Sequence, residues 1–172
     1  MLDLSYQVRA TLVALVTTSC VLLVTVSPDL ALPAHAHELL LLGHLAALAL
    51  GLGAVLAIDW HGLLWLLRRI DLPELLTVTS RLTTPVWTGL TGLVVTGALL
   101  SPDTDAPLTR LKLLLVGLVT FNGLHAGAVH SALLRAGAGT LPRRLLARGL
   151  AVGAVSQVGW WGATVIGLLN TT

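Results

Sequence analysis

The chain has 172 residues, of which 55% are hydrophobic and only 10% are charged, and its mean hydropathy is +0.89. Soluble domains carry about 25% charged residues, so most of this surface is expected to face lipid rather than water. The net charge is only +2 and the arginines are scattered, which argues against a nucleic-acid-binding protein. Cys20 is the single cysteine, which excludes an internal disulfide and a cysteine-based metal motif.

Five apolar segments follow one another along the chain. They cover residues 10–28, 38–60, 84–101, 109–134 and 147–169. A helix needs about 20 apolar residues to cross a bilayer, and backbone groups in hydrocarbon must be satisfied within the segment itself. No alternating pattern predicts transmembrane strands. We therefore predict an all-α integral membrane protein, a single domain over residues 1–172 that forms a bundle of five transmembrane helices.

The first segment admits a second interpretation. Arg9, the apolar run after it and the small residues Ala34 and Ala36 around His35 also resemble a secretory signal with its cleavage site. Cleavage there would make His37 the new N-terminus, where its amine and imidazole can chelate a metal. The apolar run is longer than in most signals, so a retained membrane anchor is the preferred prediction.

Basic residues between the segments predict the orientation. The first connection has no Lys or Arg, the second carries Arg68, Arg69 and Arg81, and the fourth carries four arginines: Arg135, Arg143, Arg144 and Arg148. Loops rich in Lys and Arg stay on the cytoplasmic side. We expect a multi-pass protein of the bacterial inner membrane, with its N-terminus in the cytoplasm and its C-terminus outside.

Ionisable side chains within or beside the segments are the main functional signal. Such groups are costly at membrane depth and indicate a functional site by default. They are five histidines and one aspartate: His37, His44, Asp59, His61, His125 and His130. Neutral imidazole is the commonest protein ligand of metals, so these six residues are the predicted metal ligands.

Helix geometry places the histidines at different depths. With a rise of about 1.5 Å per residue, His44 and His125 differ in depth by about 15 Å. They are therefore expected to ligate separate sites, or to meet across a homodimer. His44 has no histidine at its own level, and its expected partners are its own copy in a dimer or side chains of the fifth segment, namely Gln157, Trp161 and Thr164.

A second group of ionisable residues is expected near the cytoplasmic surface. His61 and His130 agree in depth within about 5 Å. Asp59 lies close to His61 along the chain and can join the two histidines in a relay or second metal site. It can equally end the apolar core or pair with a loop arginine.

Three stretches resemble the membrane domain of bacterial copper-resistance D proteins and related small histidine-containing membrane families. They are HLAALALGLGAV, SRLTTPVWTGLTGLVVTGALL and TRLKLLLVGLVTFN, within residues 38–130. The family pattern combines a histidine, a Thr-Gly pair near the end of a span and a lysine that opens the next span, here His44, Thr96-Gly97 and Lys112. The resemblance implies copper uptake or handling, and related four-helix proteins imply b-type haem and electron transfer.

The chain departs from that pattern in ways that bear on the metal. Its only methionine is Met1, whereas soft thioether ligands suit Cu(I). It has five predicted spans and no soluble copper-binding domain. The difference in depth between His44 and His125 disfavours haem held by both histidines of one chain.

We predict a membrane protein that binds haem b or copper through its histidines, for electron transfer or copper handling. No nucleophile–base set or phosphate-binding loop predicts an enzyme, although a redox carrier fits. One alternative is a cofactor-free accessory subunit that associates with a partner membrane subunit or a second copy through its glycine stripes. These stripes include Gly43 and Ala47 of the second segment and Gly89 and Gly97 of the third. Another is a small proton-coupled transporter that uses Asp59 and the histidines as a relay. The expected partner is the lipid bilayer, not nucleic acid.

Overall fold

The structure, a computed structural model, describes residue 19, residues 33–137 and residues 142–169. These residues contain four long helices: α2 (Ala34–Leu66), α3 (Leu72–Leu99), α4 (Pro107–Ala136) and α5 (Arg143–Leu169). Each is long and apolar enough to cross a membrane. The all-α fold is confirmed. The described residues hold four helices that could span a membrane and not the five predicted, and apart from Ser19 the first predicted span lies outside the described residues.

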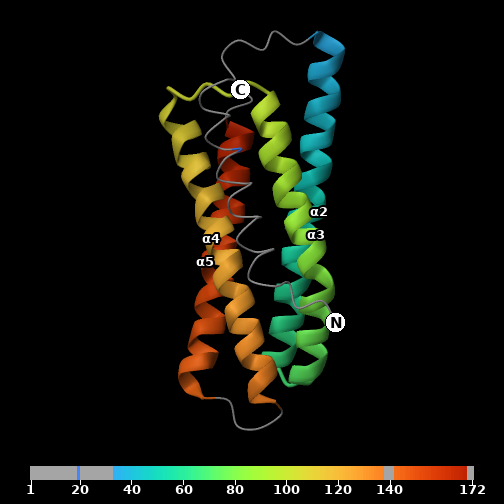
Figure 1. The fold of residues 1–172 in the computed structure, drawn as a ribbon, viewed down its shortest axis with the longest axis vertical. Helices are drawn as coiled ribbons and strands as arrows, with labels where there is room; N and C mark the ends of the chain where they lie inside the picture. The colour runs from blue at the N-terminus through green and yellow to red at the C-terminus, as the bar shows by residue number, and fades with distance from the viewer. Residues whose placement is uncertain (1–18, 20–32, 138–141, 170–172) are drawn as a thin grey trace.

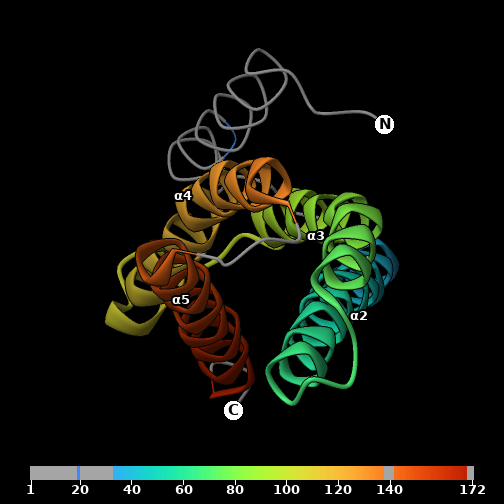
Figure 2. The same cartoon turned by 90° about the horizontal axis from the view of Figure 1, so that it is seen from below.

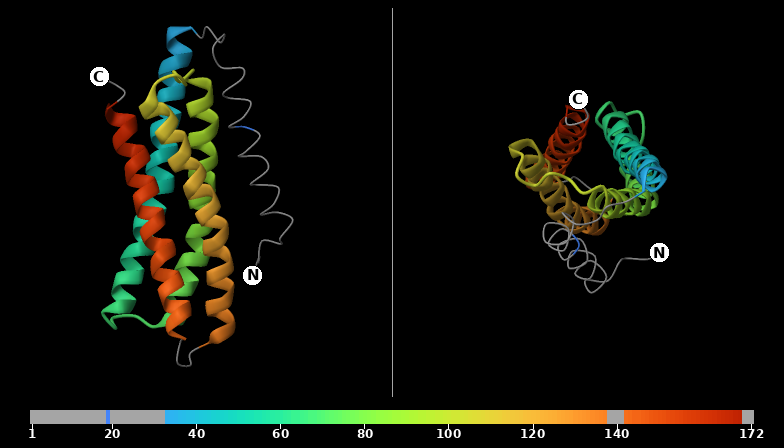
Figure 3. Two further views of the ribbon diagram at one scale, coloured as in Figure 1. Left: turned by 90° about the vertical axis from the view of Figure 1, so that its left-hand side faces the viewer. Right: turned by 90° about the horizontal axis from the view of Figure 1, so that it is seen from above.

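The four helices run alternately up and down the bundle (Figure 1). α2 packs along α3 and α4 packs along α5, so the fold consists of two antiparallel hairpins. Contacts between the hairpins are much sparser. Views along the bundle show the helices as an arc, with α2 and α5 at its two ends (Figures 2 and 3).

Helix α3 begins well before residue 84, where the third span was predicted to start. The Asp71 side chain caps it by accepting a hydrogen bond from the Glu74 N–H at 2.8 Å. Pro73 stands in the first turn, where a helix does not need the missing N–H. Pro85, which the sequence suggested as the start, lies inside the helix. Membrane helices tolerate such a proline because neighbouring helices and Ser or Thr side chains compensate for the lost bond.

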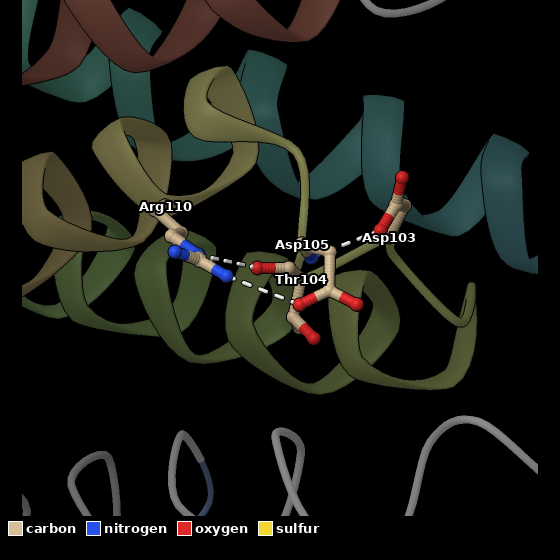
Figure 4. A network of polar contacts seen from close by, with 4 residues as sticks. All are labelled: Asp103, Thr104, Asp105 and Arg110. Carbon is tan, nitrogen blue, oxygen red and sulfur yellow. Dashed lines mark hydrogen bonds and ion pairs between the residues drawn. The ribbon is translucent and has the colours of Figure 1, made fainter.

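A short polar network lies in the connection between α3 and α4, at one end of the bundle (Figure 4). The Arg110 guanidinium donates to the Thr104 carbonyl at 2.8 Å and to an Asp105 carboxylate oxygen at 3.0 Å. The Asp105 N–H in turn donates to the Asp103 side chain at 2.9 Å. Arg110 and Asp105 are largely exposed, so this ion pair shapes the connection more than it stabilises the fold.

The core of the bundle takes one buried side chain from each helix: Val55, Leu90, Val119 and Trp160. Many of the other large apolar side chains are exposed, among them Leu39, Leu114 and Phe121. A chain whose outer surface is this apolar has to be solvated by lipid.

Candidate functional site

His44 of α2 is half-buried and faces the last turn of α3. Its Nδ1 lies 2.8 Å from the Thr96 hydroxyl oxygen. That hydroxyl lies 2.6 Å from the Gly92 carbonyl, to which it donates. A hydroxyl has a single hydrogen, so the imidazole Nδ1 has to be the donor to Thr96. Neutral His44 therefore carries its free lone pair on Nε2.

A glycine beside Thr96 permits this close approach. A Cβ atom at Gly97 would lie 3.2 Å from the His44 Cε1 atom, which is tighter than ordinary van der Waals contact. At Gly43, next to His44, a Cβ atom would make only an ordinary contact with the Thr96 methyl group, at 3.7 Å, so the approach depends on Gly97 rather than on Gly43. The Thr-Gly pair thus supplies both the hydrogen-bond acceptor and the space for the imidazole.

Lys112 adds a positive charge to this site. It is half-buried in the second turn of α4, close enough for its charge to act on the His44 imidazole. Within the described ranges no carboxylate forms an ion pair with it. We call His44, Thr96, Gly97 and Lys112 the outer site, because the predicted orientation puts it near the outer face. His44, Thr96 and Gly97 are in contact across α2 and α3, and Lys112 comes from α4.

Asp59 belongs to a different network, nearer the other end of α2. Its Oδ2 accepts a hydrogen bond from the Gln157 amide of α5. The Gln157 oxygen accepts one from the Trp161 indole N–H at 2.8 Å. The other carboxylate oxygen of Asp59 faces Gly153, where a Cβ atom would lie 3.9 Å away. Gln157 is therefore the partner of Asp59 and Trp161 is the partner of Gln157, whereas the sequence suggested both as partners of His44.

The remaining predicted ligands lie apart from the outer site. His61 uses its Nδ1 to contact the Ala57 carbonyl of its own helix at 2.7 Å. His37 and His125 are exposed on the outside of α2 and α4, and His130 is half-buried with a contact of its own. In the part of the chain that the structure describes, no group of three or more His, Cys, Asp or Glu side chains can hold a metal ion. Metal ligation by these residues stays a prediction.

Thr96 is the functional residue whose role the sequence analysis missed. It was noted as half of a Thr-Gly pair but was not assigned as the partner of His44. A signal was available: threonine at the buried end of a span commonly hydrogen-bonds across helices. Asn122 is a second such bridge, since its amide donates to the Val152 carbonyl of α5 at 2.9 Å.

The chain was also compared with known proteins. No protein family, no curated protein and no solved structure matches it.

Proposed function

We propose that this protein is a haem b-binding membrane protein that carries electrons, in which His44 would hold the haem iron. The observation that carries the proposal is the hydrogen bond from His44 Nδ1 to Thr96, which fixes the tautomer and leaves Nε2 for a metal. Haem proteins commonly use one proximal histidine. An iron porphyrin bound there would supply the one-electron chemistry.

The role of Thr96 follows from the general behaviour of metal-binding histidines. Such a histidine almost always donates its second ring N–H to an oxygen atom, which fixes the ring orientation and raises the basicity of the ligating nitrogen. The Thr96 hydroxyl is that oxygen, and it is held in turn by the Gly92 carbonyl. His44 is thus oriented by α3 before any ligand arrives.

The charge at the outer site favours haem over a bare copper ion. The Lys112 ammonium, which forms no ion pair with a carboxylate of the described residues, repels a cation but attracts the carboxylates of haem propionates. A copper ion also needs several protein ligands, and the described residues offer no cluster of three. A porphyrin brings four nitrogen ligands of its own, so one histidine from the chain is sufficient.

The orientation proposed from the sequence is consistent with the placement of the arginines. The end of α2, where Arg68 and Arg69 lie, is at the same end of the bundle as the start of α5, where Arg143 and Arg144 lie. We propose that this end faces the cytoplasm of a bacterial cell. The outer site then lies near the opposite face of the inner membrane.

Absorption spectroscopy of the purified full-length protein tests the proposal. Protein produced with an adequate haem supply is expected to show a Soret band, which His44→Ala abolishes. His125→Ala, a matched change of an exposed histidine, is expected to keep the band. Lys112→Gln is expected to keep the band but to weaken haem affinity, measured by haemin titration of the apoprotein. Circular dichroism checks that each variant is folded.

Three outcomes would overturn the proposal. Copper found by elemental analysis without a Soret band would favour copper handling. A colourless, metal-free protein, obtained even after haemin is added, would favour the accessory subunit. A band that survives His44→Ala but is lost in His125→Ala would move the ligand to α4.

A further inference from the structure

We propose that the outer surface of α4 is a dimer interface, on which α4 of a second copy packs so that the two His125 side chains hydrogen-bond to each other within the membrane. The inference is independent of the haem proposal, because His125 is not a member of the outer site. It rests on the depth of His125, on the spacing of the exposed residues around it and on the hydrogen-bonding capacity of imidazole.

His125 is exposed although it lies deep in its membrane span. At about 1.5 Å per residue it is about 5 Å from the middle of α4, and a hydrocarbon core is about 30 Å thick. The exposed arginines Arg81 and Arg148 lie further from the middle of their helices, and their long stems reach the headgroups. The shorter His125 side chain has no such route to water.

The imidazole of His125 makes no hydrogen bond to any of the described residues. In its neutral form it has one N–H donor and one acceptor nitrogen. Lipid tails offer a partner to neither, and ionisable side chains within membrane spans almost always face protein or a water-filled cavity. The outward position of His125 therefore indicates that another protein surface covers it.

Exposed residues extend from His125 along α4 as a continuous stripe. Their spacing alternates between three and four residues, which is the pattern of a coiled-coil seam. Leu114 is 71% exposed and Phe121 is 62% exposed, so no described helix covers them. We call six residues the α4 stripe: Leu111, Leu114, Leu118, Phe121, His125 and Ala128. His125 is thus the one polar residue of an otherwise apolar seam.

A second copy of the chain is the occupant that the α4 stripe fits. Two copies with the same orientation in the membrane are related by a twofold axis along the membrane normal, which brings each residue near the axis beside its own copy. The N–H of one His125 can then donate to the acceptor nitrogen of the other, since imidazole offers both. In coiled coils a single polar residue in the seam specifies the register and the number of chains.

The glycine stripes noted in the sequence are used within the chain. A Cβ atom at Gly89 would meet the backbone of Gly51 and Ala47, and one at Gly97 would meet the His44 ring. These small residues therefore serve the crossing of α2 with α3. Association with a second copy needs another surface, and the α4 stripe provides one.

Disulfide cross-linking of the full-length apoprotein in lipid vesicles tests the interface. Phe121→Cys is made in a Cys20→Ser background, so that the new thiol is the only one. Mild oxidation is expected to give a covalent dimer on a non-reducing gel. Val158→Cys is the matched control, because Val158 is 64% exposed on α5. Phe121 and Val158 each lie 15 residues from the same end of the bundle, Ala136 of α4 and Arg143 of α5. The control is expected to stay monomeric.

Variants of His125 test the hydrogen bond across the interface. The dimer fraction is measured by single-molecule photobleaching over a range of protein-to-lipid ratios. Hydrogen bonds between membrane helices are modest, so His125→Leu is expected to weaken dimerisation by about threefold to about 20-fold. His125→Asn, whose amide is also both donor and acceptor, is expected to keep the dimer. His37→Leu, at an exposed histidine near the start of α2, is expected to change nothing.

Three results would overturn the proposal. The first is a Phe121→Cys variant that does not cross-link, or one that cross-links no better than Val158→Cys. The second is a His125→Leu variant that dimerises as tightly as the wild type. The third is an internal disulfide between Cys20 and the thiol introduced at position 121, in the chain that keeps Cys20. That disulfide would assign the α4 stripe to the first predicted segment instead of a second copy.

Discussion

The outer site shows how a single hydroxyl determines the chemistry of a membrane histidine. The Thr96 hydroxyl is used twice, once as a donor to the Gly92 carbonyl and once as the acceptor from His44. In hydrocarbon no water can replace either partner. The bond therefore specifies the tautomer of His44 and also joins α2 to α3.

Replacing Thr96 by valine tests how much the hydrogen bond between Thr96 and His44 contributes to the free energy of unfolding. Valine has nearly the same shape but offers no acceptor, so His44 Nδ1 loses its partner. Hydrogen bonds between membrane helices average about 0.6 kcal/mol and reach about 1.7 kcal/mol. We expect Thr96→Val to lower the free energy of unfolding by about 1 kcal/mol, measured by denaturant titration in micelles.

The matched control lies on the same helix. Thr83 is also half-buried, but its hydroxyl donates only to the Thr79 carbonyl of its own helix at 2.8 Å. Thr83→Val is expected to change the free energy of unfolding by less than Thr96→Val. Equal effects of the two substitutions would show that the bond to His44 contributes nothing specific.

The sequence predicted the members of the outer site but not their geometry. The family resemblance singled out His44, Thr96-Gly97 and Lys112, without assigning Thr96 as the partner of His44. Their contact depends on how α2 and α3 cross, and this crossing cannot be predicted from the local amino-acid sequence. The pairing of Asp59 with Gln157 was missed for the same reason, since the two residues come from opposite ends of the described chain.

At the scale of the helices, α2 and α3 cross with their backbones close together. A Cβ atom at Gly89 would lie 2.4 Å from the Gly51 nitrogen and 2.7 Å from the Ala47 carbonyl oxygen. Both neighbours are backbone atoms, which cannot move away by a change of side-chain rotamer. Small residues drive helix association in membranes because they allow this approach, and the glycine stripes noted in the sequence serve that purpose here.

Substituting alanine for Gly89 is expected to push the two helices apart. Overpacking costs about 1–3 kcal/mol in a well-packed core, and we expect a loss of that size in the free energy of unfolding. Gly53→Ala on α2 is the control, because a Cβ there meets nothing within 4 Å. It is expected to be neutral or slightly stabilising, since alanine favours a helix over glycine. A Gly89→Ala variant as stable as the wild type would contradict the tight crossing.

Among the properties of the helices, their lengths were predicted least well from the sequence. Hydropathy marks the part of a helix that lies in lipid, whereas caps and turns determine where the helix ends. The second span was predicted over residues 38–60, but α2 runs from Ala34 to Leu66. Similarly, the capping bond at Asp71 extends α3 through a polar stretch that hydropathy alone excludes.

At the scale of the whole molecule, the two helical hairpins are each well packed, but few buried side chains join one hairpin to the other. Trp160 is the residue that connects them most directly. It is 4% exposed, packs with Leu90 and Val119, and lays its ring against Gly51 of α2. Its indole N–H, however, has no hydrogen-bond partner among the described residues. Packing of the Trp160 ring therefore stabilises the junction, whereas burial of its unpaired indole N–H destabilises it.

Two substitutions at Trp160 separate these contributions. Trp160→Ala removes the ring from the junction, and we expect a loss of about 3 kcal/mol, at the lower end of the range for buried aromatic residues. Trp160→Phe keeps most of the ring and deletes an unpaired N–H, whose burial costs about 1–3 kcal/mol.

For Trp160→Phe we therefore expect the free energy of unfolding to stay within about 1 kcal/mol of the wild type, because the smaller ring volume and the deleted N–H offset each other. Denaturant titration of both variants, with circular dichroism as the signal, gives the comparison. If Trp160→Phe loses as much stability as Trp160→Ala, the indole N–H has a partner in the membrane. The junction between the hairpins would then be held by a polar contact rather than by packing of the ring alone.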